Sequence, residues 1–235
     1  MLIFRIATWN TQGNSFAEGK LASLVKKNAP DVICLQECGT LSNLTCQHFC
    51  QSDDDSESDE SCEELTISFG THSRKVDYKV FFYPWGYSNK RCSLATLVKS
   101  SVLVKGQSIV QLTYKSGIRN LLRVIICDQH YKSIIIDNAH LPAHCSNQAK
   151  TLVKERLSWP MKDCNFIFIG DMNVPIYEWE RENLKFGPYG PTTETQKMGN
   201  TLDYIFTDLK VVSINADECY HGSDHLAVSY EIDLN

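Results

Sequence analysis

Carboxylates, carboxamides and imidazoles follow directly on apolar runs at six places in the chain. The segments are Thr8-Trp9-Asn10, Gln36-Glu37, Asn138-Ala139-His140, Gly170-Asp171-Met172-Asn173, Thr201-Leu202-Asp203-Tyr204 and Ser223-Asp224-His225. Side chains of these kinds bind divalent cations and transfer protons. Because buried strands hold their ends rigidly, segments that are distant in sequence can bring such side chains to one place. The pattern predicts a metal-assisted hydrolytic site built on strand ends.

The segment Gly170-Asp171-Met172-Asn173 places an acid and a carboxamide two residues apart, directly after the apolar run 166–169. Glycine at its first position allows the backbone to turn and to approach a ligand closely. The alternative is structural, with Asp171 capping the strand in an Asx turn. Glu37 follows another apolar run, where a carboxylate suits a hard cation such as Mg²⁺ or is simply a solvated loop acid.

Asp203 is the most informative single residue, because it lies within the apolar segment 202–206. A carboxylate is expensive to bury without a partner such as an imidazole. Asp224 and His225 precede the last apolar run and can serve a metal and a phosphoryl oxygen, although such a pair is also common on surfaces. His140 ends the apolar run 134–136, where a histidine is more often a hydrogen-bonded rim residue than a catalyst.

The elements that position these side chains follow from the apolar periodicity. Residues 2–6 alternate as in a strand, and a capping-box pattern at Ser15 and Glu18 begins a helix that ends before Pro30. Residues 31–35 form the next buried strand. Strand, helix and strand in this order open an α/β domain.

Closely spaced strands follow, and their short spacing favours antiparallel hairpins and meanders. We expect a helix at residues 147–157 and strands at residues 76–83, 93–98, 108–113, 121–127, 133–137, 166–169, 202–206, 211–214 and 226–232. With 235 residues, of which 43% are hydrophobic, the chain can bury a full core. We therefore expect one α/β domain over residues 1–235, with two packed sheets and helices outside.

The acidic residues are concentrated in one stretch of the chain. Eight of them lie within twelve residues: Asp53, Asp54, Asp55, Glu57, Asp59, Glu60, Glu63 and Glu64. The formal net charge is −5, so the rest of the chain carries +3, which permits a phosphate-bearing substrate without requiring one. No apolar run is long enough to span a bilayer. Residues 1–6 are too short for a secretory leader, so we expect the chain as given to be soluble, and a mature form whose leader was removed is the alternative.

Residues 40–65 read as an acidic surface insertion, because the Ser/Asp/Glu-rich part cannot bury enough apolar surface to order itself. A solvating loop is favoured over a phosphorylated one, and binding of a basic partner is a further alternative. Asn43 begins a glycosylation sequon that has meaning only in a secreted chain. Cys46, Cys50 and Cys62 flank the stretch, where a loop disulfide or reduced thiols are favoured over zinc.

Together and in this order, the strand-end segments resemble the endonuclease/exonuclease/phosphatase superfamily of metal-dependent phosphoesterases. The resemblance covers nearly the whole chain outside residues 40–65. Within the superfamily, the chain is most similar to the B subunits of cytolethal distending toxins, through the segments at residues 8–13, 36–39, 69–74, 91–95 and 199–204. The resemblance implies a four-layered αββα sandwich of two mostly antiparallel sheets, with the site at one edge.

The resemblance also implies which residues bind the metal and the phosphate. Glu37, with Asp224 and Asn10, holds Mg²⁺ in this arrangement, for which Mn²⁺ or Ca²⁺ can substitute or assist. Arg91 binds phosphate, and Arg74 has the same role unless it is a plain surface arginine.

The remaining roles belong to the reaction itself. Asp171 and Asn173 orient or activate the attacking water, and His140 is the general acid toward the leaving oxygen. His225, held by Asp203, contacts the phosphate. A metal and cationic donors would then stabilise charge on the pentacovalent phosphate.

The implied function is a Mg²⁺-dependent DNA endonuclease of toxin type that damages DNA. Delivery subunits or a host partner, and action in a target-cell nucleus, follow from the same resemblance, although Lys26-Lys27 is too short for a nuclear-import run. Val174 and Lys75 stand where the toxin subunits usually have arginine and proline, and Val174 weakens the inferred contact with the DNA backbone. The alternatives are a phosphoinositide phosphatase of the same fold and a catalytically idle binding protein.

Overall fold

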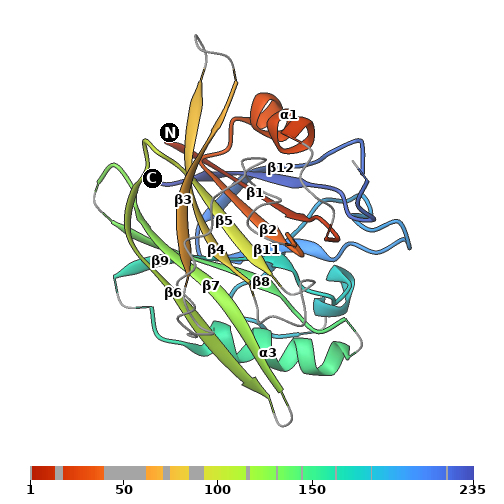
Figure 1. The fold of residues 1–235 in the computed structure, drawn as a ribbon. Coiled ribbons are helices and arrows are strands. Elements are labelled where there is room, and N and C mark those ends of the chain that lie inside the picture. Colours follow the sequence, from red (N-terminus) through yellow and green to blue (C-terminus); the bar gives the residue numbers. More distant parts are fainter. Residues whose placement is uncertain are drawn as a thin grey trace, which may run out of the picture.

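The computed structural model describes most of the chain, and the statements below concern this part. The described residues are 2–13, 18–39, 62–70, 75–84, 93–114, 117–130, 132–143, 145–161, 163–180, 182–220 and 222–235. They form two β-sheets with helices on the outside (Figure 1).

The first sheet has seven strands in the order β12-β13-β1-β2-β5-β4-β3. Their bounds are β1 Ile3–Asn10, β2 Val32–Gln36, β3 Glu63–Phe69, β4 Val76–Tyr83, β5 Leu94–Lys99, β12 Lys210–Ala216 and β13 Val228–Asp233. Only β1 and β2 pair in parallel, while the other neighbours in this sheet are antiparallel. The last strand, β13, therefore lies between β12 and the first strand of the chain.

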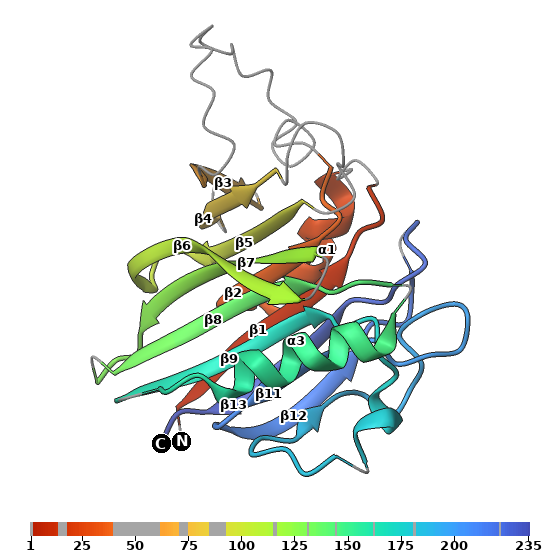
Figure 2. The same cartoon turned by 90° about the horizontal axis from the view of Figure 1, so that it is seen from below.

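The second sheet has six strands in the order β10-β11-β9-β8-β7-β6. Their bounds are β6 Leu103–Tyr114, β7 Gly117–Cys127, β8 Ser133–His140, β9 Cys164–Asp171, β10 Pro188–Tyr189 and β11 Asp203–Thr207. The pair β8 and β9 is parallel and the others are antiparallel. Its outer face carries α3 (Ser146–Ser158), and the short 3₁₀ helix η2 (Ile176–Trp179) follows β9 in the chain (Figure 2).

Three apolar clusters separate the four layers. The central cluster joins the inner faces of both sheets, for example Ile6 and Val32 with Ile136 and Ile167. A second cluster packs α1 (Glu18–Asn28) on the outer face of the seven-stranded sheet, and a third packs α3 on the six-stranded sheet. Successive strand residues point to opposite faces, so both faces of the central strands are buried. The predicted αββα sandwich is confirmed.

Three elements of the fold, β3, β10 and η2, were not predicted from the sequence. Strand β3 begins at Glu63, inside the polar stretch assigned to the insertion, and its alternating Leu65 and Ile67 pack in the cluster beneath α1. The two-residue β10 was also missed. Residues 40–61 of the predicted insertion lie outside the described residues, as do Cys46 and Cys50, so their predicted roles remain predictions.

The predicted helices and the other predicted strands all have counterparts, although several strands are longer than expected. The strand predicted at 108–113 extends over Leu103–Tyr114, and the one at 133–137 continues to His140. Within the described part of the chain, no helix is long and apolar enough to cross a membrane. The two ends of the chain lie side by side (Figures 1 and 2), where the Leu234 N–H donates to the Leu2 carbonyl at 3.0 Å.

Candidate active site

The strand order brings the predicted side chains to one edge of the sandwich. Asn10 and Glu37 lie at the carboxyl ends of the parallel strands β1 and β2. His140 and Asp171 end the parallel pair β8 and β9, and they are direct partners in the register. The antiparallel strands β11 and β13 begin at this same edge. Asp203 opens β11 opposite Asp171, and His225 shortly precedes β13.

Asp171 is the centre of this group, with only 2% of its side chain exposed. Its Oδ2 accepts a hydrogen bond from Asn10 Nδ2 at 2.9 Å. The Nε2 atoms of His140 and His225 each lie 3.8 Å from the same oxygen. The Asn173 N–H donates to the other oxygen, Oδ1, at 3.0 Å. Groups from three other segments, together with the N–H of Asn173 from its own segment, thus converge on one carboxylate.

Gly170 determines how closely β8 and β9 approach at this point. Its φ is +143°, and a Cβ on it would lie 2.0 Å from the carbonyl oxygen of Ala139. A side chain is therefore excluded here. The sequence predicted this glycine for close approach to a ligand, but the group that it admits is the backbone of β8. The result is the register that sets His140 beside Asp171.

Asp203 and His225 form a buried pair. His225 Nδ1 lies 2.8 Å from Asp203 Oδ2, and the two side chains are 5% and 0% exposed. This is the imidazole partner that the sequence required of a buried Asp203. The other ring nitrogen of His225, Nε2, faces outward between Asp171 and Asp224, 3.8 Å from an oxygen of each.

Burial and charge act on this pair in different ways. Burial raises the pKa of the Asp203 carboxyl, while the neighbouring His225 opposes that change. Burial by itself would lower the pKa of His225, but the charge of Asp203 and its hydrogen bond, followed by Asp171 and Asp224, raise it to about 10. His225 is therefore a cation at neutral pH, aimed at the edge where an anionic substrate would lie.

Glu37 occupies a strained backbone position, with a φ of +51°. Non-glycine residues in this conformation cost about 1–2 kcal/mol and cluster at functional sites. Its carbonyl accepts hydrogen bonds from the N–H of Gly13 and the hydroxyl of Thr11, at 2.7 and 2.8 Å. Its carboxylate accepts a bond from Asn10 Nδ2 at 3.2 Å and lies 3.5 Å from His140 Nε2. The strain thus aims the carboxylate at the site.

The structure brings most of the predicted metal ligands to the site, with one change in detail. Asn10 directs its amide nitrogen between the carboxylates of Glu37 and Asp171, and its oxygen accepts the Gln12 N–H at 3.0 Å. In this orientation Asn10 holds the two carboxylates together. Asp224, with 30% of its side chain exposed, lies 3.8 Å from His225 Nε2 and offers carboxylate oxygens, which hard divalent cations prefer.

A compact group of potential metal ligands consists of Asp171, Asp203 and His225, whose ligand atoms lie within 4.8 Å of one another. Asp203 Oδ2 and His225 Nδ1 are already bonded to each other, so this group works as a chain of hydrogen-bonding residues. The side chains of Glu37 and Asp224 are less buried, with 14% and 30% of their surfaces exposed. The donor chemistry of the site fits a divalent cation.

Arg74 and Arg91, the predicted phosphate ligands, lie outside the described residues. Val174, which replaces the arginine usual in the toxin subunits, is fully buried in the cluster beneath α3. Its carbonyl accepts the hydroxyl of Tyr204 at 2.8 Å, and that hydroxyl in turn accepts Trp179 Nε1. The side chain of Val174 therefore packs in the interior, and its carbonyl supports the loop after Asn173.

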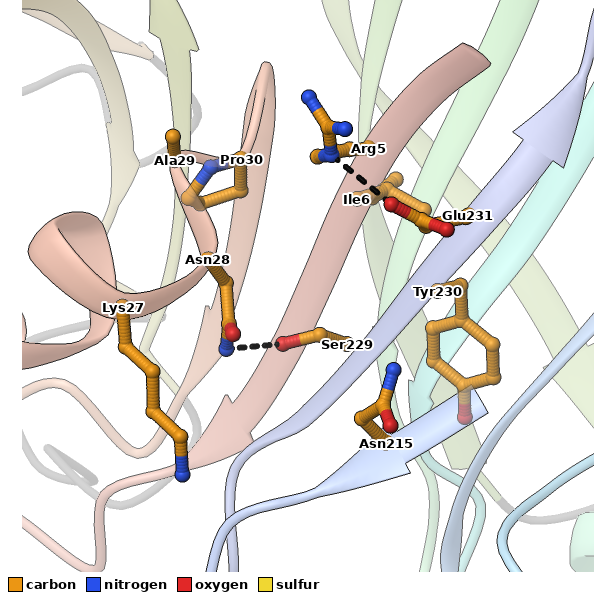
Figure 3. A pocket seen from close by; sticks show the side chains of 10 residues that line it. All are labelled: Arg5, Ile6, Lys27, Asn28, Ala29, Pro30, Asn215, Ser229, Tyr230 and Glu231. Carbon is orange, nitrogen blue, oxygen red and sulfur yellow. Dashed lines mark hydrogen bonds and ion pairs between the residues drawn. The ribbon is translucent and has the colours of Figure 1, made fainter. Parts of the chain in front are cut away.

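A hollow of about 320 Å³ lies elsewhere, on the outer face of the seven-stranded sheet beside the end of α1 (Figure 3). Two pairs among its polar residues are bonded to each other, Arg5 with Glu231 and Asn28 with Ser229, as the dashed lines show. Lys27 at its rim is paired with Asp217. None of the strand-end side chains lines this hollow, which is separate from the site.

Residues 7–225 match the Endonuclease/Exonuclease/phosphatase family. The chain belongs to this family. Its members cleave phosphoester bonds, so membership supports a hydrolase. A search of curated proteins finds no match.

Solved structures share the family fold at low sequence identity. The Haemophilus ducreyi cytolethal distending toxin superposes with a TM-score of 0.69 and 21% identity, covering 98% of both chains. CdtB, the biologically active subunit of cytolethal distending toxin, gives 0.69 and 24% over 97% of this chain and 96% of its own. D. rerio TDP2 with a single-strand DNA product gives 0.64 and 16% over 99% and 100%. The predicted superfamily and its toxin likeness are confirmed at the level of fold.

Sequence reasoning missed a network of buried hydrogen bonds in the strands directly beneath the site. Gln36 Nε2 donates to Asn138 Oδ1 at 2.8 Å and to Thr8 Oγ1 at 3.0 Å. Asn138 Nδ2 donates to the carbonyls of Leu35 and Ala95, at 3.1 and 3.0 Å. These residues precede Asn10, Glu37 and His140 by one or two positions, so polar residues inside apolar runs were the available signal.

Proposed function

We propose that this protein is a metal-dependent phosphodiesterase, and that its substrate is DNA, which it cleaves as a toxin-type endonuclease. The observation that carries the proposal is the convergence of Asn10, His140 and His225 on the Asp171 carboxylate. This arrangement puts acid-base groups and a buried cation around one point. A phosphodiester held there would meet all of them at once.

Glu37 and Asp224, with Asn10, would hold Mg²⁺, and Mn²⁺ or Ca²⁺ would substitute or assist. Such an ion, when bound, supplies Lewis-acid stabilisation of the charge on the phosphate. Asn10 could add an oxygen ligand if its carboxamide turned over, at the loss of its bonds to the two carboxylates. These acidic oxygens suit Mg²⁺, because it prefers hard oxygen ligands.

The protein's own residues would supply the remaining chemistry. Asp171, fixed by the Asn173 N–H, would orient the attacking water. His225 would bind the phosphate through Nε2, since its other nitrogen is held by Asp203. His140 would protonate the leaving oxygen. Proton transfer and preorganised charge of this kind each contribute substantially to enzymatic rates.

DNA is favoured as substrate by the fold shared with CdtB and with a TDP2 structure that holds a DNA product. The delivery subunits, host partner and nuclear action of a toxin belong to the same proposal. A phosphoinositide is the second candidate, because Val174 is buried and offers no cation to a DNA backbone. With either substrate, DNA or a phosphoinositide, Arg91 and Arg74 would bind the phosphate.

Plasmid nicking with Mg²⁺ tests the proposal. The wild-type protein should nick supercoiled DNA, EDTA should abolish nicking, and Asp171→Asn and His140→Ala should each reduce the rate by about 10²-fold or more. Glu64→Gln and His130→Ala, which alter an exposed acid and an exposed histidine, are the matched controls and should retain full activity.

The outcomes separate the alternatives. Nicking that is unchanged in the Asp171 and His140 variants would come from a contaminant and would refute the proposal. Phosphate release from a short-chain phosphoinositide, without nicking, would make the phosphatase the correct reading. If the protein cleaved neither substrate, the alternative of a catalytically idle binding protein would be favoured.

A further inference from the structure

Thr195 is a buried residue in a polar loop that neither the sequence nor the family roles identify as functional. It is fully buried, although exposed residues flank it on both sides in the segment 192–199. A buried hydroxyl must find hydrogen-bond partners, or its burial costs free energy. The partners of Thr195 therefore indicate what it does.

The side chain of Thr195 holds the start of β11. Its Oγ1 accepts the backbone N–H of Leu202 at 2.9 Å and that of Asp203 at 3.2 Å. Two accepted bonds occupy both lone pairs of a hydroxyl, so its own proton remains to be donated. Oδ1 of the nearby Asp203 carboxyl is buried and accepts no hydrogen bond from the described residues, and the interaction with Thr195 acts to lower the pKa of that carboxyl.

The backbone of Thr195 holds the other half of the buried pair. Its carbonyl accepts the Leu226 N–H at 2.7 Å, directly after His225. The next two residues extend this contact, because Gln196 forms a β-bridge with His225 and the Lys197 N–H donates to the Asp224 carbonyl at 2.9 Å. One residue is thus bonded to the segments that carry both Asp203 and His225.

We propose that Thr195 is a positioning residue, which holds Asp203 and His225 in the geometry that the reaction requires. This inference rests on the proposed function, because it assigns Thr195 to the same site. Thr195 does not touch the substrate. It acts through Asp203, whose carboxylate must keep the His225 ring turned with Nε2 toward Asp171.

Kinetics of plasmid nicking test the inference. Thr195→Val keeps the shape and removes the hydroxyl, and we expect kcat to fall roughly tenfold, as for the loss of a positioning hydrogen bond. KM should change less than about twofold, because uniform substrate binding is untouched. Thr195→Ser should restore most of the rate, and Thr192→Val, an exposed change in the same loop, should have no effect.

A double-mutant cycle separates positioning from general structural damage. If Thr195 acts through Asp203, Thr195→Val should cost little once Asp203→Asn is present, because coupled residues are not additive. A loss of the same size in both backgrounds would overturn the inference. Should Thr195→Val not fold, Thr195→Ala replaces it, because a water molecule can reach the two freed N–H groups.

A spectroscopic comparison decides the role of Thr195 even if the protein cleaves no DNA. The Nδ1 proton of His225, in its bond to Asp203, should give a downfield proton resonance in histidine-labelled wild type and in Thr195→Ser. This resonance should shift or broaden in Thr195→Val. An unchanged resonance in that variant would overturn the inference, whereas absent nicking in the wild type would refute only the proposed function.

Discussion

Replacing Asp203 with Asn should change how the stability of the protein depends on pH. Burial alone would lower the pKa of His225, but the charge of Asp203 and its hydrogen bond outweigh burial and raise this pKa from 6.5 to about 10. The folded protein therefore keeps a proton that the unfolded chain releases above pH 6.5. The stabilisation is fully present below pH 6.5 and is lost as the pH rises through about 10.

The size of the effect follows from this shift. A change of this extent corresponds to roughly 5 kcal/mol as an upper limit, since one pKa unit is worth about 1.4 kcal/mol. An asparagine oxygen can still accept a hydrogen bond from Nδ1, and burial of an imidazolium costs desolvation free energy. We therefore expect the stabilisation lost in Asp203→Asn to be about 2–3 kcal/mol. Between pH 6 and pH 10, the free energy of unfolding should therefore fall by about 2–3 kcal/mol more in the wild type than in Asp203→Asn.

Urea unfolding followed by tryptophan fluorescence, in EDTA at pH 6 to 10, measures this difference. Lysine, tyrosine and cysteine titrations are common to both proteins and cancel in the comparison. Asp77→Asn is the control, because 41% of the Asp77 side chain is exposed and its pKa is lowered, so it titrates well below this range. If the wild type and Asp203→Asn lost stability in parallel, the proton would not be held by the Asp203 and His225 pair, and the reasoning would be wrong.

Three further predictions concern the interior. Gln36→Leu leaves the buried Asn138 Oδ1 without its donor, so it should lower the free energy of unfolding by about 2–4 kcal/mol. Urea unfolding measures this loss, and a value below about 1 kcal/mol would contradict the prediction. Asp137→Asn should cost about 3–5 kcal/mol, since Asp137 is fully buried against Arg156, and full stability would refute that cost. Burial raises the pKa of the Cys38 thiol to about 12, so a thiol reagent at pH 8 should label it only upon unfolding, which mass spectrometry of labelled peptides would check.

The sequence predicted the site best where a charged residue interrupted an apolar run. A carboxylate within an apolar run has few explanations, and the partner expected for Asp203 was found in His225. Glu37 and His140 were predicted from their places after apolar runs. Their distances to Asp171, in contrast, depend on which strands pair and in which register, and periodicity along one strand does not determine this.

Other parts of the fold could not be predicted for equally physical reasons. Strand β3 follows a dense acidic stretch, and its outward-facing polar residues hide the alternation of Leu65 and Ile67. Thr195 lies in a polar segment that reads as an ordinary loop, and only tertiary packing buries it. Arg74 and Arg91 lie outside the described residues, so their phosphate-binding roles remain predictions.

The place of β13 within its sheet determines when during synthesis the site can exist. The last strand pairs with β1 on one side and β12 on the other, and His225 lies immediately before it. A chain whose synthesis has not reached residue 225 therefore lacks His225, the partner of Asp203, and also lacks the strand that lies between β12 and β1. Pairing between the two ends of a chain is a slow, non-local step of folding. An activity that depends on His225 therefore cannot arise before β13 has been synthesised and has paired with β1.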